Sequence, residues 1–216
     1  MILILLGPPG AGKGTQAKLL ARDLQIPHIS TGDMFRDHKA RGTELGKRVQ
    51  AIMDSGGLVP DEVTNDMVKE RLSRPDVAKG FILDGYPRTT AQAEYLEKLV
   101  RSLGQKIDRV LSYEVAEELL VERMSGRRTC PKCGTVYHVS ANPPKLSGYC
   151  DRDRAELVLR ADDRPESVTK RLEEYEMKTE PLRRYYHERG LLTAVEGVGT
   201  PEGILAETKL VLQGRR

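Results

Sequence analysis

Short apolar runs alternate with longer amphipathic stretches along the whole chain. The first run, Ile2 to Leu6, is uniformly apolar and ends in a glycine-rich turn, which is typical of a strand buried on both faces. A stretch with helical periodicity follows, from about Lys13 to Leu24. Further short runs occur at His28-Ile29, Phe81 to Leu83, Val110 to Val115 and Leu192 to Val195. Alternating strands and helices predict an α/β fold of three layers, with a central five-stranded parallel sheet covered by helices on both faces.

The remaining helices are predicted from periodicity and from their start and stop signals. Asp61 is expected to be the N-cap of one helix, and Pro181 is expected to kink or break the longest one. The expected helices span about Asp33 to Arg41, Glu44 to Asp54, Asp61 onward, Thr89 or Thr90 to Ser102, Glu117 to Met124, Pro165 to Arg189, and Pro201 onward.

Two segments interrupt the alternation and indicate insertions. Residues 30–59 are helical without a strand, and residues 127–163 are rich in turns and contain all the cysteines. The prediction is therefore a core domain made of residues 1–29, 60–126 and 164–216, with two inserted domains that act as lids.

Composition is that of a globular enzyme. The chain has 216 residues, of which 38% are hydrophobic and 31% charged. The longest apolar run has five residues and no basic region before it, so no signal peptide or membrane span is expected and the predicted location is the cytoplasm. The net charge of +3 is not concentrated in a basic stripe, which argues against a nucleic-acid partner.

The turn after the first strand has the composition of a phosphate-binding loop. Residues 7–15 read Gly-Pro-Pro-Gly-Ala-Gly-Lys-Gly-Thr. Glycines let backbone N–H groups surround an anion, the following helix adds its dipole, and Lys13 adds a full charge. Gly14 stands where such loops usually have Ser or Thr, and the hydroxyl comes one residue later, at Thr15. The alternative is a glycine-rich turn with a surface lysine.

Asp84 ends the buried run Phe81 to Leu83. A carboxylate at the end of a strand beside a phosphate loop suits Mg²⁺, often through water. An aspartate that only forms a turn is the alternative, and the phosphate loop favours the metal.

Several motifs resemble adenylate kinases in their order and spacing. They are Gly7 to Gln16, Ser30 to Arg36, Asp84 to Thr89 (with Tyr86 where the family has Phe), Gly126 to Arg128, and Arg160 to Asp163. The resemblance covers essentially the whole chain and suggests the bacterial form with a long lid. It implies a P-loop NTPase-like fold with a helical NMP-binding insertion and a small zinc-ribbon-like lid. It also implies a monomer that catalyses ATP + AMP ⇌ 2 ADP with Mg²⁺.

The resemblance also implies roles for individual residues. Those matching the ATP site are Gly10, Ala11, Gly12, Lys13, Gly14, Thr15, Arg123, Arg127, Val136, Tyr137 and Gly199. Those matching the AMP site are Thr31, Arg36, Gly57, Leu58, Val59, Gly85, Tyr86, Pro87, Arg88, Gln92, Arg160 and Arg171. The catalytic set is Lys13, Asp84, Arg88, Arg123, Arg160 and Arg171, and Asp162 and Asp163 match acids of the lid.

The residue types agree with phosphoryl transfer on physical grounds. The reaction needs alignment and positive charge rather than covalent chemistry from the protein, and arginines hold phosphates through two parallel hydrogen bonds. Several of these arginines come from the insertions, so the cationic cage is expected to form on closure, which also excludes water. No general base is assigned.

Cysteine spacing indicates a zinc site. Cys130 and Cys133 form one pair, and Cys150 with Asp153 forms a second pair of the same spacing. Zinc held by four protein ligands would be structural and would stabilise a lid too small for its own core. His138 is the rival fourth ligand, and three unrelated cysteines are the remaining alternative.

Two other functions stay open at this point. A kinase for UMP or CMP, or one using GTP, would share most motifs, although Thr31 and Gln92 resemble the adenine-selecting pattern. A zinc-ribbon module that binds nucleic acid on a P-loop scaffold would show salt-dependent binding to DNA or RNA.

Overall fold

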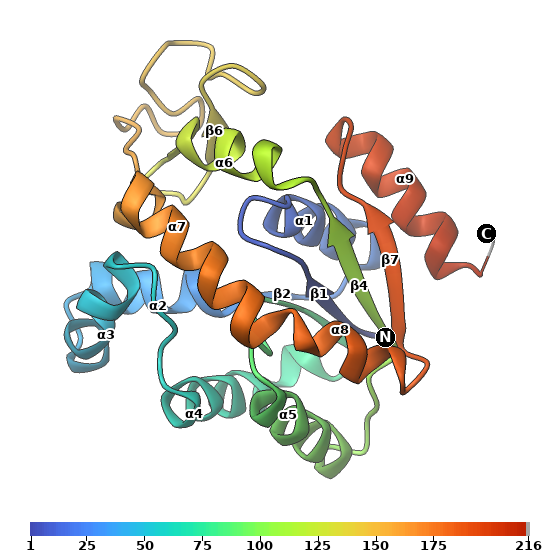
Figure 1. The fold of residues 1–216 in the computed structure, drawn as a ribbon. Helices are drawn as coiled ribbons and strands as arrows, with labels where there is room; N and C mark the ends of the chain where they lie inside the picture. Colours follow the sequence, from blue (N-terminus) through green and yellow to red (C-terminus); the bar gives the residue numbers. More distant parts are fainter. Residues whose placement is uncertain (215–216) are drawn as a thin grey trace.

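The computed structural model describes residues 1–214 and confirms the predicted five-stranded parallel sheet (Figure 1). The strand order is β2-β3-β1-β4-β7, and every neighbouring pair runs parallel. The strands are β1 (Ile2–Leu6), β2 (His28–Ser30), β3 (Phe81–Asp84), β4 (Arg109–Glu114) and β7 (Leu192–Glu196). In the register, Leu5 of β1 lies opposite Asp84 of β3, and Ser30 of β2 lies on the other side of Asp84. The carboxyl ends of three strands therefore meet around Asp84.

Helices cover both faces of the sheet, as expected for parallel strands that are apolar on both sides (Figure 1). One face packs against α4, α5 and α8, and the other against α1, α6, α7 and α9. The helices are α1 (Lys13–Leu24), α2 (Thr31–Ala40), α3 (Glu44–Asp54), α4 (Asp61–Leu72), α5 (Thr90–Ser102), α6 (Glu117–Ser125), α7 (Pro165–Glu174), α8 (Pro181–His187) and α9 (Pro201–Leu212). Two short 3₁₀ turns lie at Pro75–Val77 and Ala161–Asp163.

The prediction that Asp61 caps α4 is wrong. Pro60 is the N-cap residue and has no side chain that can cap, while Asp61 is the first helical residue. Its carboxylate instead accepts hydrogen bonds from Thr89 Oγ1 and Gln92 Nε2, both at 2.7 Å. An acid in the first helical turn is still favoured by the helix dipole. Thr89 does cap α5, because its hydroxyl accepts from the Gln92 amide at 3.1 Å.

The long helical stretch between residues 165 and 187 is interrupted near Pro181, as predicted. A π-helical turn, Tyr175–Thr179, separates α7 from α8, and Pro181 is the first residue of α8. Proline at this position has no N–H to donate, so the hydrogen-bond ladder of α7 cannot continue through it.

Residues 30–59 and 127–163 each have a small apolar cluster apart from the two clusters at the sheet. Phe35, Val49 and Val59 pack with Met67 of α4 in the first, and Cys130, Tyr137 and Cys150 pack together in the second. The second segment also contains an antiparallel hairpin of β5 (Arg127–Thr129) and β6 (Val136–His138). Within residues 1–214, no helix has the length and apolar character needed to cross a lipid bilayer.

Candidate functional site

The phosphate loop connects β1 to α1 and contains glycines that no other residue replaces without strain. Gly7, Gly10 and Gly12 have φ values of 137°, 87° and 86°, a region that favours glycine. A Cβ at Gly7 would lie 2.6 Å from the Tyr113 carbonyl oxygen, and one at Gly10 would lie 3.0 Å from that of Leu120. The loop is therefore held tightly between β4 and α6.

Lys13 closes this loop from the first turn of α1. Its Nζ donates hydrogen bonds to the carbonyl oxygens of Gly7 at 2.6 Å and Pro8 at 2.8 Å. Burial lowers the pKa of Lys13 from 10.5 to about 8, against the opposing effect of the Asp84 carboxylate. An ammonium with so little hydration gains strongly from a phosphate partner.

Asp84 lies at the end of β3, directly against the first turn of α1. A Cβ at Gly14 would lie 3.3 Å from Asp84 Oδ2, so a glycine after Lys13 leaves room for the carboxylate. His28 Nε2 lies 3.4 Å from the same oxygen. Burial alone would raise the pKa of Asp84, but His28, Lys13 and the Arg88 guanidinium outweigh it and hold this pKa below its ordinary value. The carboxylate is thus kept anionic, and its hard oxygens suit Mg²⁺.

Arg88 interacts with the charge of the same carboxylate and is fixed by hydrogen bonds of its own backbone and side chain. Its backbone N–H donates to Gln92 Oε1 at 2.7 Å, and its Nε donates to the Gly85 carbonyl at 2.8 Å. Gln92 Nε2 in turn donates to Asp61. Burial and the neighbouring Arg36 lower the pKa of Arg88, although Asp84 opposes them. Sequence reasoning assigned Gln92 but gave no role to Asp61, which was read as a helix cap.

Tyr86 is fully buried, and its hydroxyl has partners. The Tyr86 hydroxyl donates to Asn65 Oδ1 at 2.5 Å and also contacts the Gln92 carbonyl at 3.3 Å. Asn65 therefore satisfies the hydroxyl of this buried tyrosine, which a phenylalanine would lack. Thr31 Oγ1 donates to the Gly85 carbonyl at 2.8 Å, which joins α2 to the same loop.

Arg36 comes from α2 and pairs with Asp33 one turn earlier. Burial and the nearby Arg160 lower the pKa of Arg36. The turn after α3 contains Gly57, Leu58 and the buried Val59, which precede α4.

Three arginines converge on two aspartates between the hairpin and α7. Arg127 Nε donates to Asp163 Oδ2 at 2.7 Å, and Arg171 Nη1 donates to Asp163 Oδ1 at 2.8 Å. Arg160 Nε donates to Asp162 Oδ1 at 2.9 Å. The Asp163 side chain is 0% exposed, so its charge is compensated entirely by these neighbours. The structure therefore brings the predicted arginines together, on acids that occupy them.

Burial and the neighbouring charges act in opposite directions on the pKa values of this cluster. Burial lowers the pKa of Arg171 to about 10, and the charges of Arg127 and Arg160 act in the same direction against the two aspartates. Burial would raise the pKa of Asp162, but Arg160 and Arg171 outweigh it and hold it far below its ordinary range. Such a set of cations binds phosphate oxygens strongly once the acids yield them.

The remaining residues predicted for ATP lie in two places, Arg123 and Gly199 near the end of β7 and Val136 and Tyr137 in β6. Arg123 Nη1 donates to the Gly197 carbonyl at 3.0 Å, which joins α6 to the loop before α9. Gly199 in that loop has a φ of 127° and open space beside it. Val136 is exposed, whereas Tyr137 is buried and its hydroxyl lies 3.6 Å from Cys150 Sγ. The Tyr137 side chain therefore faces the lid interior, and only its backbone remains for a nucleotide.

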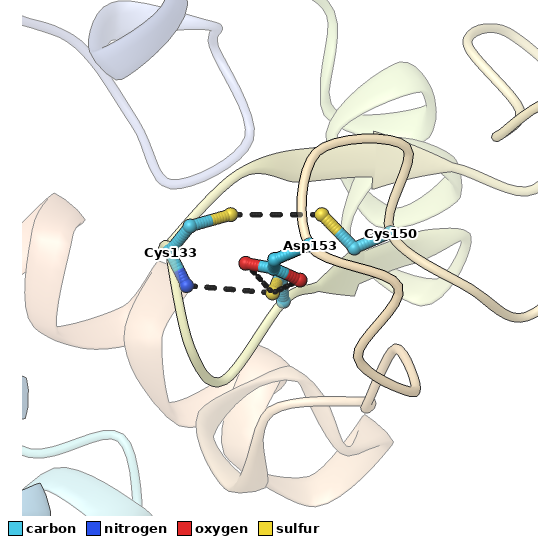
Figure 2. Close-up of side chains that lie close together, drawn as sticks. Cys133, Cys150 and Asp153 are labelled. Carbon is cyan, nitrogen blue, oxygen red and sulfur yellow. Dashed lines mark hydrogen bonds between the residues drawn. The ribbon is translucent and has the colours of Figure 1, made fainter.

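The cysteine group lies in the lid, where its ligand atoms converge (Figure 2). The three Sγ atoms and a carboxylate oxygen of Asp153 all lie within 4.8 Å of one another. Cys133 and Cys150 Sγ are 3.6 Å apart, and Cys130 Sγ lies 3.3 Å from Asp153 Oδ1. Hydrogen bonds from the Ala155 amide and the thiols lower the pKa of Asp153 to about 2.

This geometry fits a tetrahedral Zn²⁺. Zinc–sulfur bonds of about 2.3 Å place two sulfurs about 3.8 Å apart, close to the separation of Cys133 and Cys150. His138 is not in this group: its Nδ1 accepts from the backbone amides of Ser140 and Ala141 at 3.2 and 3.1 Å. Among the described residues, Asp153 is therefore the fourth ligand candidate rather than His138.

Comparisons with known proteins show the family of the chain. The family described as Adenylate kinase matches residues 5–191. The chain is 77% identical to the adenylate kinase of Anaeromyxobacter sp. (strain Fw109-5), over 98% of this chain and 99% of the relative. It is 51% identical to that of Symbiobacterium thermophilum, over 100% of both chains. It is 49% identical to that of Caldanaerobacter subterraneus subsp. tengcongensis, over 100% of this chain and 98% of the relative. The family match and the similarity over the whole length show that this chain belongs to the adenylate kinase family.

Proposed function

We propose that the chain catalyses the reversible transfer of a phosphoryl group from MgATP to AMP, which forms two molecules of ADP. The observation that carries this proposal is the convergence of Lys13 and Arg88 on the charge of Asp84, next to the glycine-rich loop whose carbonyl groups accept hydrogen bonds from Lys13. A donor phosphate chain held by Lys13 and an acceptor phosphate held by Arg88 would meet over that carboxylate.

The donor half consists of the phosphate loop and the edge near β7. Loop amides and Lys13 bind the ATP phosphates, Thr15 lies at the start of α1, and Arg123 with Gly199 borders the base. Bound Mg²⁺ would neutralise phosphate charge, and Asp84 would hold it directly or through water. Arg127, Arg160 and Arg171 exchange their aspartates for phosphate oxygens, which stabilises charge on the transferring group.

The acceptor half selects adenine through Gln92. An amide side chain has two donor hydrogens and two acceptor lone pairs. Gln92 donates one hydrogen to Asp61, and one of its lone pairs accepts the Arg88 N–H. One donor hydrogen and one acceptor lone pair therefore remain. Adenine presents a complementary acceptor and donor on one edge, and its exocyclic amino group donates where uracil has a carbonyl oxygen that accepts. Thr31, Arg36 and residues 57–59 complete the AMP site in this proposal.

Lid closure is the second part of the proposal. Residues 30–59 and 127–163 move as separate domains on the remaining core, and the apolar cluster confined to residues 130–157 supports this division for the second segment. Closure excludes water, which would otherwise accept the phosphoryl group. We further propose a structural Zn²⁺ on Cys130, Cys133, Cys150 and Asp153, and a monomer in the cytoplasm, where thiols stay reduced.

A coupled assay with a panel of nucleoside monophosphates tests the reaction. AMP with ATP should give turnover far above UMP, CMP or GMP. Lys13→Met and Arg88→Ala should each lower turnover by orders of magnitude. Lys79 and Arg101 are exposed and lie outside this site, so the matched controls Lys79→Met and Arg101→Ala should keep the parental turnover. Near-normal turnover in either site variant, or a preference for UMP, would refute the proposal.

A further inference from the structure

The peptide of Arg88 is held from both sides by buried side chains. Its N–H donates to Gln92, and its carbonyl oxygen accepts a hydrogen bond from Thr179 Oγ1 at 2.9 Å. Thr179 is 7% exposed and lies 91 residues further along the chain, in the π-helical turn between α7 and α8. Neither the sequence patterns nor the family resemblance drew attention to this threonine.

The hydroxyl of Thr179 is unusual in what it contacts. Helical threonines commonly donate back to the carbonyl four residues earlier. Thr64 does so to Pro60 at 3.2 Å, Thr169 to Pro165 at 3.3 Å and Thr208 to Ile204 at 2.8 Å. Thr179 donates away from its own helix, to the loop that positions Arg88.

The π-helical turn explains this difference. The carbonyl four residues before Thr179 belongs to Tyr175, and it accepts the Glu180 N–H at 2.8 Å, a bond that spans five residues. The helix is thus widened by one residue at Thr179, and the Thr179 hydroxyl donates to the Arg88 carbonyl instead of to its own helix. Single π-helical turns are frequent at functional sites, because they redirect groups in this way.

We propose that Thr179 is a positioning residue for Arg88, and that the π-helical turn serves to present its hydroxyl to the AMP site. The inference rests on the proposed function, in which Arg88 binds the acceptor phosphate. Loss of the hydroxyl would leave the Arg88 carbonyl without this partner and free the peptide to rotate. The guanidinium would then be displaced from the acceptor phosphate, while the Lys13 side of the cleft would be unchanged.

Thr179→Val tests the inference, because valine keeps the shape and removes the donor. The KM for AMP should rise about tenfold, the effect of losing one hydrogen bond and orphaning its acceptor. The KM for ATP should stay within about twofold. Thr179→Ser, which keeps the hydroxyl, should restore the parental KM for AMP. Thr208→Val, the same change at another buried helical threonine, should leave both KM values unchanged.

A double-mutant cycle with Arg88→Lys shows whether the effect passes through Arg88. Lysine lacks the planar guanidinium group of arginine, so its contact with phosphate depends less on the orientation of the residue 88 peptide. Thr179→Val should therefore weaken AMP binding much less in the Arg88→Lys background than in the parent. Full additivity of the two changes would overturn the inference.

Other outcomes would also overturn it. They are an unchanged KM for AMP in Thr179→Val, an equal rise in both KM values, or a defect in Thr179→Ser as large as in Thr179→Val. If the valine variant does not fold, Thr179→Cys replaces it, because a thiol donates weakly, and its KM for AMP must lie above that of the serine variant. A parent protein without AMP-dependent turnover would instead refute the proposed function.

Discussion

Charged side chains in the cleft already have partners within the protein. Lys13 donates to two loop carbonyls, and Arg127, Arg160 and Arg171 lie on Asp162 and Asp163. Burying charge costs free energy unless it is paired, so these contacts keep the cleft folded without ligand. They also mean that nucleotide binding is an exchange of partners rather than a simple addition of contacts.

Lys13 gives a pH-dependent stability prediction. Its pKa is about 8 in the folded protein and 10.5 ordinarily, so the unfolded chain binds more protons between these values. The stability of the parent should therefore rise with pH relative to Lys13→Met between about pH 8 and 10.5. Melting temperatures of nucleotide-free proteins measure this difference. Lys79→Met should show no such trend, and a constant gap between parent and Lys13→Met would contradict the prediction.

Residue roles were only partly visible in the sequence. Lys13 and Asp84 were predicted from local motifs whose chemistry can be inferred from residue type and spacing, whereas Arg88 was predicted from the resemblance of residues 84–89 to adenylate kinases. Asp61 was misread, because an acid before a helical stretch predicts a cap and the competing partners Thr89 and Gln92 are distant in sequence. Thr179 carried no signal, since its contact with Arg88 depends on how two loops meet in the fold.

Elements were predicted well wherever burial imposes a period. All five strands of the sheet and the break at Pro181 agree with the apolar pattern and with proline chemistry. The lid hairpin was missed because β5, Arg127–Thr129, contains no apolar residue that would mark a strand. The buried cluster of the lid consists mainly of cysteines, so no amphipathic pattern of apolar residues marks its elements in the sequence.

Gly126, between α6 and the hairpin, gives a prediction at this scale. A Cβ there would lie 2.2 Å from His138 Nε2. Gly126→Ala should therefore destabilise the protein by about 1–3 kcal/mol through overpacking. Adding His138→Ala removes the clashing ring and should recover most of that loss. Urea unfolding of the parent, the two single variants and the double variant measures this coupling, and additive losses would argue against the clash.

The proposed zinc site gives a second prediction for this element. Metal analysis should find about one zinc per chain, and a chelator should lower the melting temperature more than it lowers activity at moderate temperature. Asp153→Ala should weaken zinc retention, whereas Asp151→Ala, two residues away and outside the ligand group, should not. Purified protein without zinc would refute the site.

On the scale of the whole molecule, α7 connects the two insertions. Ser167 Oγ donates to the Asp54 carbonyl at 2.9 Å, and a Cβ at Gly56 would lie 2.5 Å from the Ser167 carbonyl oxygen. A few positions along, Arg171 lies on Asp163, which also holds Arg127 of the lid. Movement of either insertion must therefore change contacts on the same helix.

Asp163→Asn tests this convergence. The change keeps the shape but leaves three arginines with one fewer compensating charge, so it should cost about 3–5 kcal/mol of stability in the free protein. A bound non-hydrolysable ATP analogue should raise the melting temperature of Asp163→Asn more than that of the parent, because phosphate replaces the lost carboxylate. Asp37→Asn, which breaks an exposed pair with Arg41, should change little. Equal stabilisation of both proteins by the analogue would contradict this account.

The separate apolar cluster of the lid has a consequence for how the chain opens. Its buried members are Cys130, Tyr137 and Cys150, with no shared residue in the clusters at the sheet. A unit with so few apolar contacts opens without disturbing the rest of the fold. Amide hydrogens of β5 and β6 should therefore exchange with deuterium by local unfolding, orders of magnitude faster than those of β1 and β3. A bound ATP analogue should slow that exchange in β5 and β6, and equal exchange rates in β5 and β1 without nucleotide would show that residues 127–163 are not a cooperative unit of their own.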